Sequence, residues 1–285
     1  QNSLEKVYGY NSLALWDQQQ VQSKMASERY LGGLYDANSG HIHPLNYTLG
    51  LAKAALDAGV TIYTDSAVTK VTRKSQANIC HTAQGQISAQ QVLFCGNAYM
   101  GKLVPEISNK IMPVGTYIGA TEPLGKARAE ALISNNMAVA DINFVLDYFR
   151  LSADYRMLFG GRVSYSTLAP PNLNHSMRQR MLAVFPQLAD VNMAYSWGGN
   201  VAITMNRGPH FGRVGKDLYF AQGFSGHGIA ATGLAGKLLA EAVAGQAERF
   251  DLFKEISHLP FPGGTLLKTP ALMLAMTWYR LRDML

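Results

Sequence analysis

The chain has 285 residues, of which 48% are hydrophobic and 15% are charged, and this composition excludes disordered and collagen-like proteins. At about 150 residues per domain, the length allows one large domain or two ordinary ones. The 25 basic and 19 acidic residues leave a net charge of +6, but the basic residues are scattered, so we expect no nucleic-acid partner. Two cysteines without metal-ligand spacing predict no disulfide framework and no metal site, and they favour a reducing, cytoplasmic compartment.

The ends of the sequence carry no membrane or export signal. The chain begins Gln-Asn-Ser without the basic and apolar regions of a signal peptide. Its most apolar stretch, residues 269–279, is shorter than the roughly 18 apolar residues of a membrane span and runs into Arg280 and Arg282. We therefore expect no transmembrane segment, and an amphipathic C-terminal helix that packs on the body of the protein.

The first 108 residues predict alternating strands and helices. The clearest signal is a helix that starts at Pro44, because apolar residues recur at helical spacing as far as Ala58-Gly59. An apolar strand over 92–95 ends in Gly96-Asn97-Ala98, and in α/β sheets ligands bind at this end of the strands. A glycine that only makes a turn is the alternative. The other elements predicted here are a helix over 18–25 capped by Asp17, strands over 30–35, 60–63 and 67–71, and a hairpin of 79–82 with 87–89.

From about residue 110 to residue 207 the pattern is typical of an antiparallel α+β domain. Residues 153–155 predict a hairpin turn, and residues 174–185 predict a helix that ends at Pro186. Strands are predicted over 112–121, 144–152, 156–161 and 194–202.

After a segment over 209–214 and a strand predicted over 218–221, a glycine-rich loop precedes a helix over 229–243. The loop, residues 223–228, has three glycines in six residues, which lets the backbone approach a ligand closely. The following helix N-terminus presents N–H groups and positive potential, so a ligand with partial negative charge is expected. A turn that serves only close helix-on-strand packing is the alternative.

Six short motifs occur in order along the chain. They begin at residues 40, 94, 148, 209, 223 and 260 and have the sequences GHIHPLN, FCGNAY, YFRLSAD, PHFGR, GFSGHG and PFPGG. Together they resemble the FAD-dependent amino-acid and amine oxidoreductases, the family of the D-amino-acid, glycine and sarcosine oxidases. The resemblance covers almost the whole chain and is strongest to the members that oxidise gamma-glutamylputrescine in polyamine catabolism.

This resemblance implies an α/β plus α+β fold, with a partial Rossmann-like FAD-binding domain interleaved with an antiparallel-sheet substrate domain. The implied boundaries are 1–40 for the N-terminal segment of the substrate domain, 41–108 for the second half of the FAD-binding domain, 109–207 for the antiparallel sheet, and 208–285 for the C-terminal flavin loop and helices. The sequence contains no GxGxxG turn, so we expect it to lack the nucleotide-binding unit with which this family begins.

The resemblance also implies non-covalent FAD, because residues 199–204 contain no cysteine to attach it. The expected reaction is oxidation of an amine C–N bond to an imine and then an aldehyde, with gamma-glutamylputrescine or a related polyamine derivative as substrate and O2 as acceptor, forming H2O2. Leu158 stands where some relatives have an oxygen-activating lysine, which leaves oxidase and dehydrogenase open. A glycine- or sarcosine-type enzyme and a non-catalytic truncated remnant are the alternatives, and the oligomeric state stays open.

The site residues implied by the resemblance fall into three groups. His227 is the catalytic candidate, with capping of its loop as the alternative. The substrate candidates are Tyr148, Arg150 and Arg207; core packing of the tyrosine and ion pairs of the arginines are the alternatives. The cofactor candidates are Val68 for the adenine, Gly96 and Asn97 for the dinucleotide, and Gly223, Phe224, Ser225, Gly226, His227 and Gly228 for the flavin ring.

Overall fold

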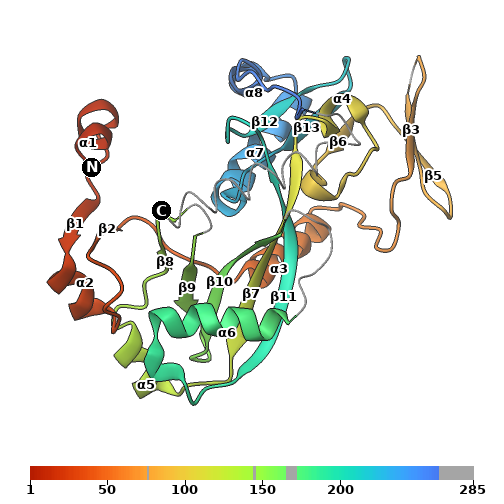
Figure 1. Ribbon diagram of the computed structural model, residues 1–285. Helices are drawn as coiled ribbons and strands as arrows, with labels where there is room; N and C mark the ends of the chain where they lie inside the picture. Colours follow the sequence, from red (N-terminus) through yellow and green to blue (C-terminus); the bar gives the residue numbers. More distant parts are fainter. Residues whose placement is uncertain (76, 144–145, 165–171, 263–285) are drawn as a thin grey trace.

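The structure, a computed structural model, describes residues 1–75, 77–143, 146–164 and 172–262 (Figure 1). The C-terminal helix predicted over 269–279 lies outside these residues. In the described part of the chain, no helix has both the length and the apolar character that a membrane crossing requires.

The larger sheet is antiparallel and has the strand order β11-β7-β10-β9-β8. Helix α6 (Leu173–Val184) crosses one of its faces (Figure 1), and α5 (Lys126–Leu132) and the 3-10 turn η2 (Pro186–Leu188) complete that side. The core between them is built on Phe149, Phe159, Met177 and Phe185, each at most 2% exposed. The strands are β7 (Met112–Thr121), β8 (Val139–Ala140), β9 (Tyr148–Leu151), β10 (Met157–Ser164) and β11 (Met193–Ile203).

The second sheet has three strands in the order β12-β13-β6, with β13 parallel to β6 and antiparallel to β12. Helices α7 (Gly228–Val243) and α8 (Glu248–Lys254) pack on it through a separate core that contains Phe211, Tyr219 and Phe250. The strands are β6 (Val92–Phe94), β12 (His210–Arg213) and β13 (Leu218–Gln222); the turn η1 (Asn97–Tyr99) and the helix α4 (Pro105–Ser108) follow β6.

The N-terminal segment lies against the larger sheet's domain. Its helix α2 (Gln18–Lys24) is capped as the sequence predicts, because the Asp17 carboxylate accepts a hydrogen bond of 2.8 Å from the backbone N–H of Gln20. Beyond it, the Ser27 hydroxyl donates to the carbonyl of Val184 at the end of α6. The other elements of this segment are α1 (Asn2–Tyr8), β1 (Leu13–Asp17) and β2 (Gly32–Asp36), whose two strands pair with each other.

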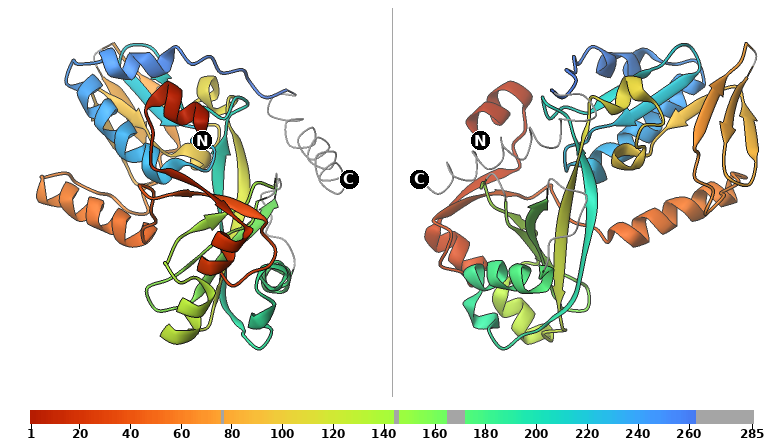
Figure 2. Two further views of the ribbon diagram at one scale, coloured as in Figure 1. Left: turned by 90° about the vertical axis from the view of Figure 1, so that its left-hand side faces the viewer. Right: turned by 45° about the vertical axis from the view of Figure 1, so that its right-hand side comes forward.

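Helix α3 (Pro44–Asp57) confirms the predicted helix, yet in the described structure none of its residues is buried. Leu45, Leu49 and Leu56 are each more than half exposed, and the helix projects from the body of the molecule (Figure 2). After it comes a small sheet of β3 (Lys70–Arg73), β4 (Asn78–His81) and β5 (Gln86–Ala89).

Three predicted strands need correction. Residues 60–63 pair with no strand of the described chain, and the strand predicted over 67–71 begins at Lys70, so Val68 precedes it. The strand predicted over 144–152 begins at Tyr148 in the described residues. An apolar, β-branched run forms a strand when a partner supplies the ladder hydrogen bonds, and residues 60–63 find no such partner here.

Candidate active site

A cavity of about 1030 Å³ lies between the face of the larger sheet opposite α6 and the residues at the start of α3. Strand alternation builds its wall. Tyr148, Arg150 and Leu158 line the cavity, whereas Phe159, next to Leu158, belongs to the core under α6. Because side chains along a strand alternate between the two faces, one sheet forms both the core and the cavity wall.

Two consecutive glycines in β10 make room for the first side chain of β9 and for the side chain just before it. A Cβ at Gly160 would overlap the Tyr148 ring, and a Cβ at Gly161 would overlap the carboxylate of Asp147. The pairing of β10 with β7 shifts register at this point, which is a β-bulge. Tyr148 therefore lies close against the strand on the cavity side; its hydroxyl hydrogen-bonds Thr116, and burial raises its pKa.

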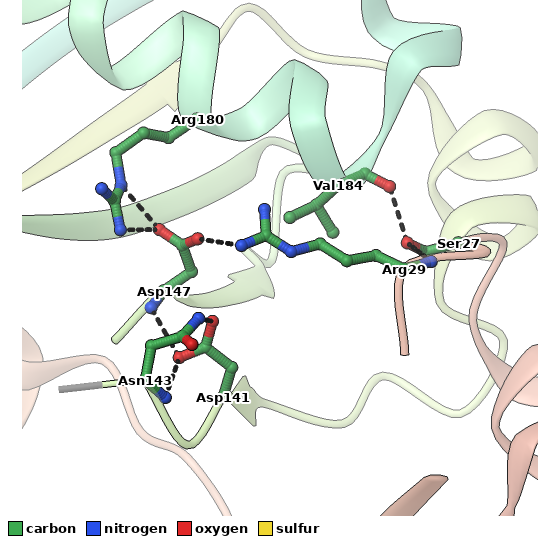
Figure 3. Close-up of polar contacts among 7 residues, drawn as sticks. All are labelled: Ser27, Arg29, Asp141, Asn143, Asp147, Arg180 and Val184. Carbon is green, nitrogen blue, oxygen red and sulfur yellow. Dashed lines mark hydrogen bonds and ion pairs between the residues drawn. The ribbon is translucent and has the colours of Figure 1, made fainter. Parts of the chain in front are cut away.

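Asp147 lies on the α6 side and is held by two arginines (Figure 3). Its side chain is 2% exposed; its Oδ1 lies 2.7 Å from Nε of Arg180 on α6, and its Oδ2 lies 3.5 Å from Arg29 of the N-terminal segment. Burial raises the pKa of Asp147, and the neighbouring Arg180 opposes that rise. This ion pair joins α6 and the N-terminal segment to the residue before Tyr148.

The turn that leads into β9 is closed by Asp141 (Figure 3). The Asp141 carboxylate accepts hydrogen bonds from the backbone N–H of Asp147, at 3.0 Å, and from the N–H and side-chain amide of Asn143. Together with burial, this carboxylate raises the pKa of nearby Tyr30 to about 12. The start of β9 is thus fixed on both sides of the sheet.

Substituting Gly160 by alanine tests whether the bulge positions Tyr148. We expect Gly160→Ala to lower the free energy of unfolding by about 1–3 kcal/mol, because the added methyl group displaces the tyrosine ring. In a Tyr148→Ala background the same substitution should cost much less, since the overlapping ring is gone. Urea denaturation of the four proteins of this double-mutant cycle measures the coupling; additive effects would contradict the packing argument.

Arg150 lines the cavity but also holds the start of α3 in place. Its guanidinium donates to the carbonyls of Ile42, at 3.1 Å, and Leu151, and lies 3.2 Å from Nδ1 of His41. Arginine has no acceptor, so His41 accepts at Nδ1 and donates from Nε2 to the carbonyl of Asn136. Burial lowers the pKa of Arg150. Both a structural and a substrate-binding role fit this position.

The structure does not bring all three substrate candidates together. Tyr148 and Arg150 share the cavity, whereas the described lining does not include Arg207, which follows β11 with a positive φ of 63°. His43, near His41 in sequence, accepts from the backbone N–H of Asn46 and so caps the start of α3.

The predicted flavin loop divides into an anchored half and an open half. Gly223, Phe224 and Ser225 are buried; the N–H of Gly223 donates to the side-chain carbonyl of Asn97 at 2.9 Å, and the N–H of Ser225 donates to Ala202 at the end of β11. Gly226 and His227 are exposed. The anchored half therefore holds the loop, and the open half is free to meet a ligand.

The open half fits a flavin. Gly226 has a φ of +93°, and a Cβ built on it would have no described atom within 4 Å. His227 stands at the N-cap of α7 but forms no side-chain cap in the described structure, and the first turn of α7 has no acidic residue. The first turn of an α-helix has N–H groups without an intrahelical partner, and these together with the positive helix end suit the electron-rich edge of a reduced ring system.

The remaining cofactor candidates occupy different settings. Gly96 is exposed just after β6, and a Cβ there would lie 2.6 Å from Cγ of Met100, so a larger residue would displace the Met100 side chain. The side-chain carbonyl of Asn97 accepts the hydrogen bond from the N–H of Gly223, so Asn97 lies against the loop. Val68 is 40% exposed in the segment before β3. Their contacts with FAD stay predictions.

Sequence reasoning missed the charged residues that lie behind the cavity wall, on the α6 side, and those that line the cavity itself. Asp147 and Arg180 are far apart in sequence and each looks like an ordinary surface residue. Asp154 lies in the predicted hairpin turn and Arg156 at the start of the strand predicted after it, and their place in the cavity wall follows from the register of β9 with β10. The adjacent glycines at 160 and 161 were the one local signal, because two glycines inside a strand indicate a bulge or a close approach.

The fold has two parts. The first is a small α/β sheet that carries the glycine loop, and the second is an antiparallel sheet with a cavity on one face. The loop lies at the end of the antiparallel sheet, and together the two parts define an α/β fold with a site for a ligand. The glycine oxidase of Geobacillus kaustophilus has this fold: its structure matches 87% of this chain and 67% of its own with a TM-score of 0.75 at 19% identity. The expected mixed fold with antiparallel sheets is confirmed. The domain boundaries stay a prediction.

The model of the FAD-dependent oxidoreductase family matches residues 1–242, and the chain belongs to this family. It is 43% identical over 279 residues to the gamma-glutamylputrescine oxidoreductase of Escherichia coli K12, covering 98% of this chain and 65% of that protein. It is also 43% identical over 282 residues to the probable oxidoreductase OrdL of Haemophilus influenzae, covering 98% and 64%. The chain thus spans about two thirds of the length of these curated relatives.

Proposed function

We propose that this chain is part of an FAD-dependent enzyme that oxidises the C–N bond of gamma-glutamylputrescine or a related acylated diamine, with O2 as the electron acceptor. The observation that carries the proposal is the 43% identity to a gamma-glutamylputrescine oxidoreductase, which extends over 98% of this chain. The large, mainly apolar cavity on the wall of the antiparallel sheet supports it. A cytoplasmic location, where polyamine derivatives are metabolised, belongs to the same proposal.

When bound, FAD would accept a hydride equivalent from the carbon next to the amine, leaving an imine that water hydrolyses to an aldehyde. The residues of this chain supply the conditions under which the amine can react. Ile118, Leu158 and Trp197 give the cavity apolar walls, which disfavour the ammonium form and keep the reacting amine neutral. The proton released from the ammonium on binding passes to solvent. Tyr148 and Arg150 would orient the amine, and the N–H groups of the first turn of α7 would hold the cofactor's electron-rich edge.

We propose further that a nucleotide-binding unit completes the cofactor site, since the chain spans about two thirds of its curated relatives. The exposed apolar face of α3 and the free edge of β6 in its three-stranded sheet suit packing by such a unit. Val68, Gly96 and Asn97 would then lie near the join, and His227 would contact the flavin or the substrate.

The first test is the visible spectrum of the protein made from the complete reading frame. We expect bound flavin, and we expect gamma-glutamylputrescine to bleach its absorbance under anaerobic conditions. Glycine and sarcosine are the matched controls: bleaching by these and not by the acylated diamine would replace the substrate assignment with a glycine- or sarcosine-type one. A colourless protein that does not take up FAD would overturn the proposed function in favour of a non-catalytic remnant.

A further inference from the structure

A charged pair lies at one end of the cavity. Asp154 and Arg156, in the turn between β9 and β10, both line it, with Nε of Arg156 donating to Oδ2 of Asp154 at 2.6 Å. The other oxygen of Asp154 accepts from the hydroxyl of Ser152 at 2.6 Å. These two hydrogen bonds lower the pKa of Asp154, so its carboxylate is ionised at neutral pH.

This pair lies at the end of the sheet opposite the glycine loop. Ser225 of the loop is hydrogen-bonded to Ala202 near the end of β11, beside the start of β7. Arg156 instead donates from Nη1 to the carbonyl of Thr121, the last residue of β7, at 2.9 Å. Figure 1 shows the same separation, with the β9–β10 turn away from the sheet that carries α7.

Between Tyr148 and this pair the cavity wall is mainly apolar; the cation in this stretch, Arg150, is hydrogen-bonded to the residues at the start of α3. From Tyr148 to Ser152 the chain advances four residues, which at about 3.3 Å per residue is roughly 13 Å. Ile118, Leu158 and Trp197 line this stretch. The cavity thus suits an extended molecule with a flexible hydrocarbon centre, whose far end carries charge.

We propose that Asp154 and Arg156 form a subsite for the zwitterionic α-amino-acid head group at the non-reacting end of an extended amine substrate. The Asp154 carboxylate would receive the ammonium of the head group, and the Arg156 guanidinium would receive its carboxylate. This inference rests on the proposed function and narrows its substrate class to amines that carry both charges far from the oxidised carbon.

The two side chains are suited to this exchange of partners. The side chain of Asp154 is 61% exposed and that of Arg156 is 20% exposed, so a ligand reaches both without opening the fold. The Arg156 guanidinium also lies 5.4 Å over the ring of Tyr195, which keeps it at the cavity wall when its carboxylate partner turns to a ligand. An exposed ion pair contributes little to stability, so redirecting it toward a substrate costs the fold little.

The test compares two amines on the holoenzyme and its Asp154→Asn variant. Gamma-glutamylputrescine has the zwitterionic head group, and N-acetylputrescine has the same diamine without it. Asn retains an acceptor for Ser152, so the turn is preserved. We expect kcat/KM for gamma-glutamylputrescine to fall about tenfold, chiefly through KM, and kcat/KM for N-acetylputrescine to stay within about twofold. Asp190→Asn, an exposed ion-paired aspartate of Arg128 outside the cavity lining, should leave both values unchanged.

If kcat/KM of Asp154→Asn falls equally for both amines, or falls for neither, the proposed subsite is overturned. If the parent holoenzyme oxidises neither amine, the proposed function fails, and calorimetric titration with gamma-glutamylputrescine then decides the subsite separately. Binding that weakens in Asp154→Asn supports it. Binding of equal strength in both proteins, or to neither of them, overturns it.

Discussion

Replacing Arg180 by methionine is expected to lower the free energy of unfolding by about 3–5 kcal/mol, the range for a buried charge that loses its main partner. Asp147 is almost fully buried, and Arg180 makes its shortest contacts, at 2.7 Å. Methionine keeps much of the packing volume but supplies no donor, so the carboxylate would remain buried with the more distant Arg29. Urea denaturation at pH 7 measures the change.

Two variants separate this expectation from a general loss of packing. Arg29→Met removes a contact of 3.5 Å from a side chain that is 35% exposed, and should cost about 1 kcal/mol or less. Asp147→Leu combined with Arg180→Met removes both charges and should recover a large part of the lost stability. A double variant as unstable as Arg180→Met would show that the carboxylate is not the cause.

The second large effect is a dependence of stability on pH that comes from His210. Burial, with smaller contributions from His258 and Lys110, lowers the pKa of His210 to about 3. Its Nδ1 lies 3.0 Å from the side-chain amide of Gln222, which donates to it and so requires the neutral ring. The unfolded chain instead takes up a proton below about pH 6.5. Stability is therefore full above pH 6.5 and is lost as the pH falls toward 3.

Between pH 7 and pH 5 this residue should remove about 2 kcal/mol of unfolding free energy, since each unit of pKa difference corresponds to about 1.4 kcal/mol. Burial also lowers the pKa of His258, whose ring centroid lies 4.4 Å from that of His210, so its contribution has the same sign. Denaturation curves for the parent and His210→Gln proteins across this range give, for each protein, the slope of the unfolding free energy against pH. Identical slopes would contradict the assignment to His210.

Most of the sheet elements could be predicted because their signals are local. The strand over 112–121 was predicted with its observed bounds, and the helices after Asp17 and His43 begin where capping chemistry places them. Residues 60–63 were mispredicted because their composition suits a strand, while pairing depends on a neighbour that the local sequence does not reveal.

The candidate site was predictable in its backbone and less so in its side chains. The glycine loop at 223–228 was found because glycine and a helix start are visible in sequence. That Ser225 is buried and His227 exposed depends on Asn97 and Ala202, which contact the loop from the turn η1 and from β11. Asp154 and Arg156 line the cavity because of the register in which β9 pairs with β10, and a turn motif alone does not reveal that register.

The parallel pairing of β13 with β6 has a consequence for the order of folding. Near this pairing, Gly223 bonds to Asn97 across 126 residues, and the whole antiparallel sheet lies between them in the chain. Contacts of such long sequence separation close late, because the entropy of a large loop must be lost first. During synthesis the antiparallel domain can collapse before β13 has emerged, and β6 is unpaired during that time. Until then the apolar residues of β6 lack their partners, which makes this interval the one most sensitive to aggregation.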